Sequence, residues 1–276
     1  MFSNGDAYVV GNLLPHQYLW NFVPDTIADK SSPEFTEPML IPHFETTVLA
    51  YNSELNESCP VTNIWELTQP EWKDKIIIED PLTDTSTLNM MLTYVSHAQE
   101  MNSAYMDLYG TEPVLDADTP DAGWLWLKRI AQNAPIPEQS GKEVNSAFAN
   151  PGVKDSYLAF TSYSSYSDVL DGTLAFEPCW DVQPVLGVQS QSYLANINLA
   201  PHPNPAKLFM HFITSEEGRK PWECFGSYIT DSTYQVSEGK MDMKDMLAVT
   251  WFVDDQFAYD NMIYARDFYF LNLSNP

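Results

Sequence analysis

Runs of apolar residues separated by polar and turn-forming residues predict a succession of strands along the chain. The stretch from Thr46 to Tyr51 is rich in β-branched and apolar side chains, which is typical of a strand. Residues 76–78 are three consecutive isoleucines, which suits a strand covered on both faces. Shorter strands are expected at residues 7–10, 174–176 and 194–197.

Helical periodicity follows the isoleucine run. Between Leu88 and Leu108 the apolar residues recur at helical spacing, which predicts one long helix with Asp84 as a natural N-cap. A second helix is expected over residues 121–132. The Pro- and Gly-containing stretch 133–157 is interpreted as a surface excursion.

Two more helices are expected in the last third of the chain. Asn204 followed by Pro205 is typical of a helix start, with an N-cap residue and Pro at the first helical position, and Gly218 is expected to end this helix. Another helix, strongly aromatic, is expected from Asp254 to Phe270. Because strands alternate with helices, the pattern favours an α/β fold.

The charge balance narrows the classes of protein to which the chain could belong. Its 276 residues include 38 acidic and 13 basic side chains, which gives a net charge of −25. That charge argues against a nucleic-acid partner, which needs a basic surface, and disfavours docking on anionic lipid. It suits a cationic ligand, and like-charge repulsion that keeps a protein dispersed explains it equally well. No apolar run is long enough to span a membrane, and no signal segment precedes Phe2 in this chain.

The chain lacks the short motifs that carry common enzyme chemistry. It has no Gly-rich phosphate loop, no HExxH zinc sequence and no GxSxG nucleophile turn. The five histidines show no metal-ligand spacing, so neither a metal site nor a cofactor is predicted. Cys59, Cys179 and Cys224 include no CxxC pair, and the sequence is compatible both with one disulfide plus a free thiol and with three buried thiols.

Three segments resemble bacterial receptors that capture solutes for ABC importers. Residues 63–81, NIWELTQPEWKDKIIIEDP, are similar to the Trp-x-x-Leu…Pro-x-Trp-Lys…Asp-Pro segment of the receptors for iron(III), phosphonates and polyamines. Residues 203–218 are similar to a helix of that family with the pattern Asn-x-x-Ala-Lys-x-Phe…Ser-x-Glu-Gly. Residues 46–52 resemble its hinge-crossing strand, and Asp74 stands where the first motif usually has Gly.

The resemblance implies a two-lobed periplasmic-binding-protein fold, type II-like, with hinge strands that cross between the lobes and a ligand held in the cleft. It also implies a monomeric, non-catalytic protein that is periplasmic or extracellular and lipid-anchored, and that presents a small molecule or ion to ABC permease subunits. The expected lobes are residues 1–51 with 190–235 and residues 52–189, and the C-terminal helical segment 236–276 is assigned to neither. Family members usually carry further residues before the matching segment, so the first lobe is expected to be incomplete.

Candidate ligand contacts follow from the rule that ligands of open α/β sheets bind beyond the carboxyl ends of strands. Strand ends and segments that match the family's contact loops contain the candidate residues Asn4, Asp6, Tyr8, His43, Glu45, Thr85, Ser86, Ser162, Tyr163, Tyr166, Glu177, Trp180 and Asp181. Each of them also suits a purely structural role. His43, for example, equally suits a core or surface position in which its ring nitrogens are hydrogen-bonded within the protein.

These residues leave the chemical class of the ligand open. Free N–H groups near Thr85 and Ser86 favour a phosphonate-like anion, unless this segment only caps its helix. Trp180 beside carboxylates favours an amine, because a cation is attracted to an indole face, unless the ring only packs between lobes. Tyr163 and Tyr166 suggest ferric ion, but the iron receptors of the family usually have two adjacent tyrosines and here two serines intervene.

Two other functions are compatible with the residues. A secreted acidic hydrolase could use Glu177 and Asp181 as its pair of carboxylates. A degenerate receptor-like module could contact only another protein. The order and spread of the three matching segments favour the transport receptor over both.

Overall fold

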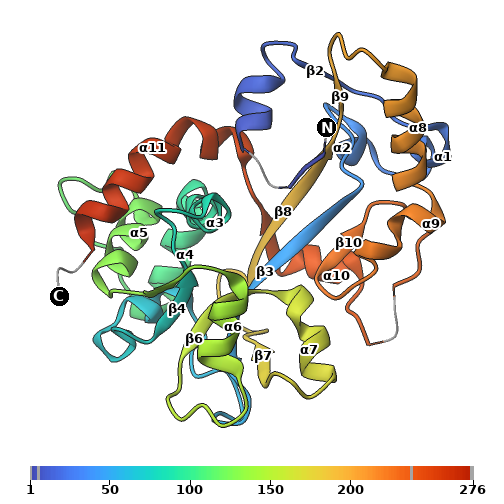
Figure 1. The fold of residues 1–276 in the computed structure, drawn as a ribbon. Helices are drawn as coiled ribbons and strands as arrows, with labels where there is room; N and C mark the ends of the chain where they lie inside the picture. The colour runs from blue at the N-terminus through green and yellow to red at the C-terminus, as the bar shows by residue number, and fades with distance from the viewer. Residues whose placement is uncertain (1, 5–6, 237–238, 274–276) are drawn as a thin grey trace.

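Figure 1 shows the fold of the computed structural model, which describes the backbone of residues 2–4 and the whole of residues 7–236 and 239–273. The strands are β1 (Phe2–Asn4), β2 (Leu19–Trp20), β3 (His43–Asn52), β4 (Ile76–Glu79), β5 (Ile136–Glu138), β6 (Leu158–Ser162), β7 (Phe176–Pro178), β8 (Gly187–Leu194), β9 (Asn196–Ile197), β10 (Ser227–Ile229) and β11 (Thr250–Phe252).

The helical segments are α-helices and short helices of other types. The α-helices are α1 (Asp25–Ala28), α2 (Pro33–Thr36), α3 (Thr85–Ser96), α4 (Ala98–Tyr109), α5 (Ala122–Gln132), α6 (Gly141–Ala149), α7 (Tyr166–Leu170), α8 (Pro203–Ile213), α9 (Glu216–Arg219), α10 (Met243–Ala248) and α11 (Asp255–Asn272). The short helices of other types are the π-helix η1 (Val9–Leu13) and the 3-10 helices η2 (Ile64–Thr68), η3 (Pro70–Trp72), η4 (Tyr163–Ser165) and η5 (Lys220–Trp222).

β3 is the strand that joins the two halves of the molecule. Its first part pairs with β8 and β10, and its second part pairs with β6 and β7, all antiparallel. Thr47 belongs to both parts, because it lies opposite Val188 in β8 and opposite Ser162 in β6. In Figure 1, β3 and β8 run together through the centre of the molecule. The expected strand over residues 46–51 is therefore confirmed, and so is the α/β two-lobed fold.

Three parallel strands bring their carboxyl ends to one edge of the sheet. β4 pairs in parallel with β5 on one side and with β6 on the other. The chain leaves these strands toward α3, α6 and η4, so these elements all begin near that edge. Because Ser162 at the end of β6 lies opposite Thr47, the edge lies next to the point where β3 passes from one half to the other.

The core lies on both faces of this sheet. The side chains of Leu49 and Tyr51 pack in one cluster of buried residues, and those of Val48 and Ala50 pack in a second cluster, as alternation along a strand requires. The isoleucines of β4 divide in the same way: Ile76 and Ile78 belong to the first cluster and Ile77 to the second. The prediction of a strand covered on both faces is confirmed.

The C-terminal helix α11 packs against the half that contains β4. It contacts α3 and α5, as Figure 1 shows, and buries Ala265 and Phe268 against them. Its N-cap is Asp254, whose carboxylate accepts the Phe257 N–H at 2.9 Å. The prediction of an aromatic helix beginning at Asp254 is confirmed, as is the helix over 121–132, which is α5 with Asp121 as its N-cap.

The prediction of a strand at residues 7–10 was wrong. Residues 7 and 8 are helical, and Val9 begins the π-helix η1. This segment packs against α11 rather than against a sheet: a Cβ on Gly11 would lie 2.1 Å from the ring of Tyr259, and Asn12 donates a hydrogen bond to the Tyr259 hydroxyl at 3.1 Å. A four-residue apolar run carries no information about such a distant partner.

The single helix expected over 88–108 is two helices that meet at His97. The backbone of His97 leaves helical geometry at φ −95° and ψ 45°. Its ring accounts for the break, because Nδ1 lies 2.9 Å from the carbonyl oxygen of Thr93 and the ring stacks on Trp251 at 4.0 Å. Apolar spacing continued across the break because both helices face the same core.

Two other boundaries differ from the expectation. The stretch 133–157 is not a simple surface excursion, since it contains β5 and α6 and buries Val144 and Phe148 completely. The helix placed at Asn204 begins at Pro203 and ends at Ile213; Gly218 lies in the next helix, α9. The strands expected near 174–176 and 194–197 are present as β7 and as the end of β8 with β9.

The three cysteines form one disulfide and one free thiol. Cys59, in the loop after β3, is bonded to Cys179, which follows β7, and Cys224 is free and partly buried. Of the two thiol arrangements that the sequence left open, the structure therefore has the first. Within the described part of the chain, no helix combines the length and the apolar character needed to cross a bilayer.

Candidate functional site

The start of α3 lies at the sheet edge where β4 ends. Thr85 and Ser86 are exposed there, as first residues of the helix. The Asp84 carboxylate accepts the Thr87 N–H at 2.6 Å, so the helix is capped by the protein itself. The capping role of Asp84 that the sequence left open is thus observed, and it places a negative charge where an anionic ligand would have to bind.

The start of α6 lies beside it and is also occupied by carboxylates. Glu143 accepts hydrogen bonds from the Gln139 N–H and from the Ser140 hydroxyl, both at 3.1 Å. Glu79, at the end of β4, accepts a hydrogen bond from the Gly141 N–H. Burial, and then the nearby charge of Asp84, raise the pKa of Glu79, and the Gly141 bond lowers it in part. These carboxylates make the edge a poor place for a second anion.

The loop after β6 contains serine hydroxyl groups next to a buried aromatic side chain. The Ser162 hydroxyl accepts the Ser164 N–H at 3.3 Å and lies 2.8 Å from the Ser164 hydroxyl. Tyr163 is buried, and the Tyr166 hydroxyl donates to Glu177 at 2.7 Å. This hydrogen bond stabilises the neutral phenol of Tyr166.

Both tyrosines of this loop hold their protons strongly. Burial, and then the charge of Glu177, raise the pKa of Tyr163 to about 12. Burial, and then the hydrogen bond to Glu177, raise the pKa of Tyr166 still further. Tyrosine binds a ferric ion as the phenolate, so binding through Tyr166 would have to displace its hydroxyl proton and the hydrogen bond to Glu177. In the described residues, no group of three or more His, Cys, Asp or Glu side chains is placed to hold a metal ion.

Trp180 joins the same aromatic cluster. Its ring meets the ring of Tyr163 edge-on at 5.8 Å, and Tyr166 meets Phe176 at the same centroid distance. Trp180 is half-buried, whereas Asp181 is exposed on the following turn. Because the ring of Tyr163 covers part of the indole surface, the structure shows the packing role of Trp180 that the sequence left open.

The candidates near the start of β3 form a separate group. His43 is buried, its Nε2 lies 3.1 Å from the Ser192 hydroxyl, and its ring stacks on Trp222 at 4.7 Å. The Glu45 carboxylate lies 3.8 Å from His43 Nε2, and its side chain is 39% exposed. His43 therefore has the contacts of a core histidine, and Glu45 is the more accessible of the two.

The N-terminal candidates lie partly outside what the structure describes. Asn4 is the last residue of β1, and its backbone lies opposite Ser192 in β8, close to the His43 group. Asp6 lies outside the described residues. Tyr8 is 49% exposed, with its ring 6.0 Å from that of Tyr259.

Sequence reasoning missed two residues that connect these groups, Phe225 and Gly226. Phe225 lies 5.9 Å from Tyr163, measured between ring centroids, and the Gly226 carbonyl oxygen accepts the Thr46 N–H at 2.7 Å. They precede β10, which pairs with the first residues of β3. The only signal in the sequence was an aromatic residue followed by Gly, which is too common to identify a contact.

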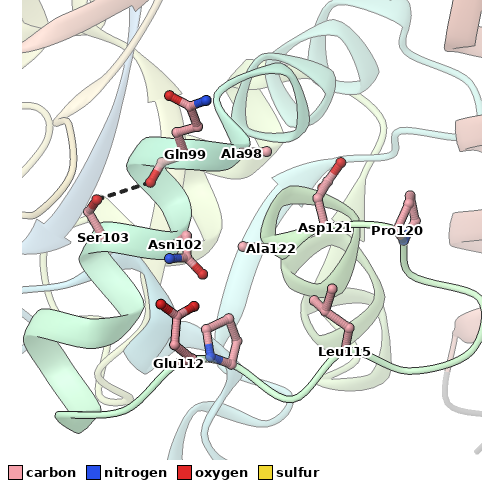
Figure 2. Close-up of a pocket in the computed structure, with 10 residues that line it drawn as sticks. Ala98, Gln99, Asn102, Ser103, Glu112, Leu115, Pro120, Asp121 and Ala122 are labelled. Atoms are coloured by element: carbon pink, nitrogen blue, oxygen red, sulfur yellow. Dashed lines mark hydrogen bonds between the residues drawn. The ribbon is translucent and has the colours of Figure 1, made fainter.

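Figure 2 shows a different surface pocket, of about 560 Å³, between α4 and the start of α5. Gln99, Asn102 and Ser103 of α4 line one side, and Asp121 and Ala122 at the start of α5 line the other. The loop between the two helices contributes Glu112 and Leu115. None of the residues predicted as ligand contacts lines this pocket. Another pocket, of about 530 Å³, lies between α6 and α7 and includes Ser165, next to the candidate loop.

Comparisons with solved structures show the fold. Iron-bound HitA from Pseudomonas aeruginosa matches with a TM-score of 0.71 at 18% identity, over 97% of this chain and 82% of that one. AfuA from Actinobacillus pleuropneumoniae, solved with fructose-6-phosphate, matches with a TM-score of 0.66 at 16% identity, over 98% and 81%. MotA from A. tumefaciens B6, solved with glucopine, matches with a TM-score of 0.65 at 13% identity, over 98% and 82%. Their ligands are chemically unrelated, so at these identities the likeness is one of fold.

Comparison with sequence families gives the family directly. The model described as bacterial extracellular solute-binding protein matches residues 44–227, which is more than half of the chain. No curated protein sequence matches. Proteins of this family are extracellular or periplasmic binding components of ABC transporters and not enzymes, so the hydrolase that the sequence left open is set aside. The chain belongs to the family of bacterial extracellular solute-binding proteins.

Proposed function

We propose that the protein captures a small polar solute that carries positive charge, between two lobes joined by β3 and β8, and delivers it to an ABC permease. The first lobe is assigned to residues 1–51 and 190–235 and the second to residues 52–189. The packing of α11 on α3 and α5 supports adding the C-terminal helix to the second lobe. We further propose that the protein works as a monomer held at the membrane by a lipid anchor.

The mechanism is closure of the lobes around the solute. β3 and β8 are paired at the crossing, from Phe44 with Gln191 to Val48 with Gly187, and small backbone rotations there would move one lobe against the other. A solute favours the closed state only by as much as it binds that state more tightly than the open one. The candidate contacts on the second lobe are Thr85, Ser86 and the loop Ser162–Tyr166.

The observation that carries the choice of a cationic solute is the occupation of both helix starts by carboxylates. Asp84 caps α3, and at the start of α6, which Ser140 caps, the carboxylates of Glu143 and Glu79 accept hydrogen bonds from the Ser140 hydroxyl and the Gly141 N–H. A phosphonate or sugar phosphate would have to displace these groups or approach them against like charge. The net charge of −25 acts in the same direction at longer range.

The contacts of Tyr163 and Tyr166 favour an amine over ferric ion in the same loop, because Tyr163 is buried and the Tyr166 hydroxyl is already hydrogen-bonded to Glu177. An amine needs no ionised tyrosine: it can donate to the Glu45 carboxylate and to the hydroxyl oxygens of Ser162 and Ser164. This reasoning favours an aliphatic amine over the other classes that the sequence left open.

Thermal unfolding in the presence of single compounds tests the proposal. The compounds are spermidine, ferric citrate, methylphosphonate, fructose 6-phosphate and glucopine. A ligand at about a hundred times its Kd stabilises the native state by about 2.7 kcal/mol, which corresponds to a rise in Tm of roughly 5 °C for a chain of this size. We expect this rise with spermidine and less than about a fifth of it with the anions.

The outcomes separate the alternatives. A rise with a phosphate or with ferric citrate and none with spermidine would show that the solute class is wrong. A flat result with every compound, including an extended panel of amines, amino acids and sugars, would favour the degenerate interaction module. Glu45→Gln should weaken spermidine binding about tenfold, because one carboxylate contact is lost. Glu57→Gln, at an exposed position in the loop after β3, serves as the control for charge alone.

A further inference from the structure

The loop Cys224–Ser227 contacts both halves of the molecule. On the side of the second lobe, the ring of Phe225 lies 5.9 Å from Tyr163 and 5.4 Å from Tyr166. On the side of the crossing strand, the Gly226 carbonyl oxygen accepts the Thr46 N–H at 2.7 Å. The loop thus links the middle of β3 to the candidate binding loop after β6.

Gly226 is required for this approach. Its φ is +68°, a conformation that side-chain-bearing residues rarely adopt. A Cβ at this position would lie 2.8 Å from the backbone nitrogen of Ser164 and 2.9 Å from the carbonyl carbon of Tyr163. Backbone therefore meets backbone across the boundary between the lobes, in a contact that a side chain would force apart.

Lys240 holds the loop from the other side. Its Nζ donates to the carbonyl oxygen of Cys224 at 2.8 Å and also to that of Ser227, so one amine bridges the two ends of the loop. The same Nζ lies 4.6 Å from the ring centroid of Tyr228. Lys240 is 8% exposed, so these protein groups replace most of its contact with water.

The position of the contact relative to β3 decides what it can do. Thr46 is next to Thr47, the first residue of β3 that pairs with both β8 and β6. Points close to a hinge move least when two lobes rotate, so a contact here can persist while the outer parts of the cleft open and close. Contacts farther out would have to break in every cycle.

We propose that the loop Cys224–Ser227 is a fulcrum, that is, a contact that stays in place while the two lobes rotate about the hinge. Lys240 and Gly226 are positioning residues: they hold this loop against the binding loop Ser162–Tyr166. The proposal rests on the proposed function, because it assumes that the lobes move. It adds a third point of contact to the two paired strands.

Amide hydrogen exchange followed by mass spectrometry tests the fulcrum without any ligand. Lys240→Met removes the amine and keeps an apolar side chain of similar length, and Lys244→Met, at an exposed position on α10, is the matched control for loss of charge. We expect Lys240→Met to speed exchange about tenfold in peptides covering residues 43–47 and 162–166, with α3 and α8 unchanged. Lys240→Arg, which keeps the donors, should restore most of the protection.

Two results would overturn the proposal. One is equal exchange in Lys240→Met and Lys244→Met over both peptides. The other is a uniform rise that includes α3 and α8, because that would mean general destabilisation. If Lys240→Met does not fold, Phe225→Leu replaces it, with Phe209→Leu on the exposed face of α8 as its control and the same expected pattern. Because no solute is present, these outcomes stay independent of whether spermidine binds.

Discussion

The disulfide between Cys59 and Cys179 gives a quantitative prediction for the stability of the second lobe. The bridge closes a loop with a sequence separation of 120 residues, which contains β4, β5, β6 and four of the longer helices. Restricting an unfolded chain over that length corresponds to about 5 kcal/mol in the chain-entropy relation, and measured bridges usually give about 2–4 kcal/mol. We therefore expect its loss to lower the free energy of unfolding by about 3–4 kcal/mol.

The perturbation is Cys59→Ser in a Cys224→Ser background. Cys59 is the partner to replace because Cys179 is completely buried, and a substitution there would add a packing defect to the loss of the bridge. Replacing Cys224 prevents the freed Cys179 thiol from pairing with it, so the single variant Cys224→Ser is the matched reference.

Urea unfolding, followed by tryptophan fluorescence and by far-ultraviolet circular dichroism, measures the difference. The urea midpoint of Cys59→Ser/Cys224→Ser should be lower than that of the reference Cys224→Ser. After reduction with dithiothreitol, the midpoint of the reference should fall to that of the double variant. Agreement between the two ways of opening the bridge would show that the effect belongs to the bond and not to the serine. A loss below about 1 kcal/mol would refute the reasoning, since the bridge would then restrict the unfolded chain very little.

Three further predictions concern single side chains. Burial lowers the pKa of Lys240 to about 8, so above that pH the unfolded chain holds more protons than the native one. The free energy of unfolding of Cys224→Ser should therefore rise by about 1–2 kcal/mol between about pH 8 and pH 10, and adding Lys240→Met should abolish the rise. Asp84→Ala should cost about 1 kcal/mol through loss of the α3 cap, and Asp181→Ala, at an exposed turn, less than about 0.5 kcal/mol in the same urea assay. Leu125→Ala should cost about 3 kcal/mol because Leu125 is fully buried, whereas Val114→Ala, 80% exposed, should leave the urea midpoint unchanged.

Local patterns were sufficient where an element is buried along its whole length. The isoleucines of β4 and the run from Thr46 to Tyr51 predicted strands because both faces of these strands are covered, which leaves an unbroken apolar signature. Asp84 predicted a helix start because capping is a local hydrogen bond between residues three positions apart. These features depend on neighbours in the sequence, so the sequence contains them.

Features decided by distant partners were missed. η1 is helical because Gly11 and Asn12 meet Tyr259, which lies almost the whole chain away. α3 ends at His97 because the ring of that residue stacks on Trp251. Of the candidate site, strand-end reasoning correctly placed Thr85, Ser86 and Ser162 along one edge. The cap by Asp84 was also predicted, because it is a local hydrogen bond. The contact of Phe225 with Tyr163 was not, because these residues are far apart in the sequence.

The double membership of β3 has a consequence for how the chain acquires its structure. In the proposed lobe assignment each lobe is assembled from pieces that are far apart in sequence. Glu45 of β3, for example, pairs with Ser190 of β8 only after both strands exist. Neither lobe is then an autonomous folding unit, because excising one strips the shared strand of half its partners. Long sequence separations of this kind slow the search for the native topology, so refolding is expected to be slow and to proceed as one cooperative event rather than lobe by lobe.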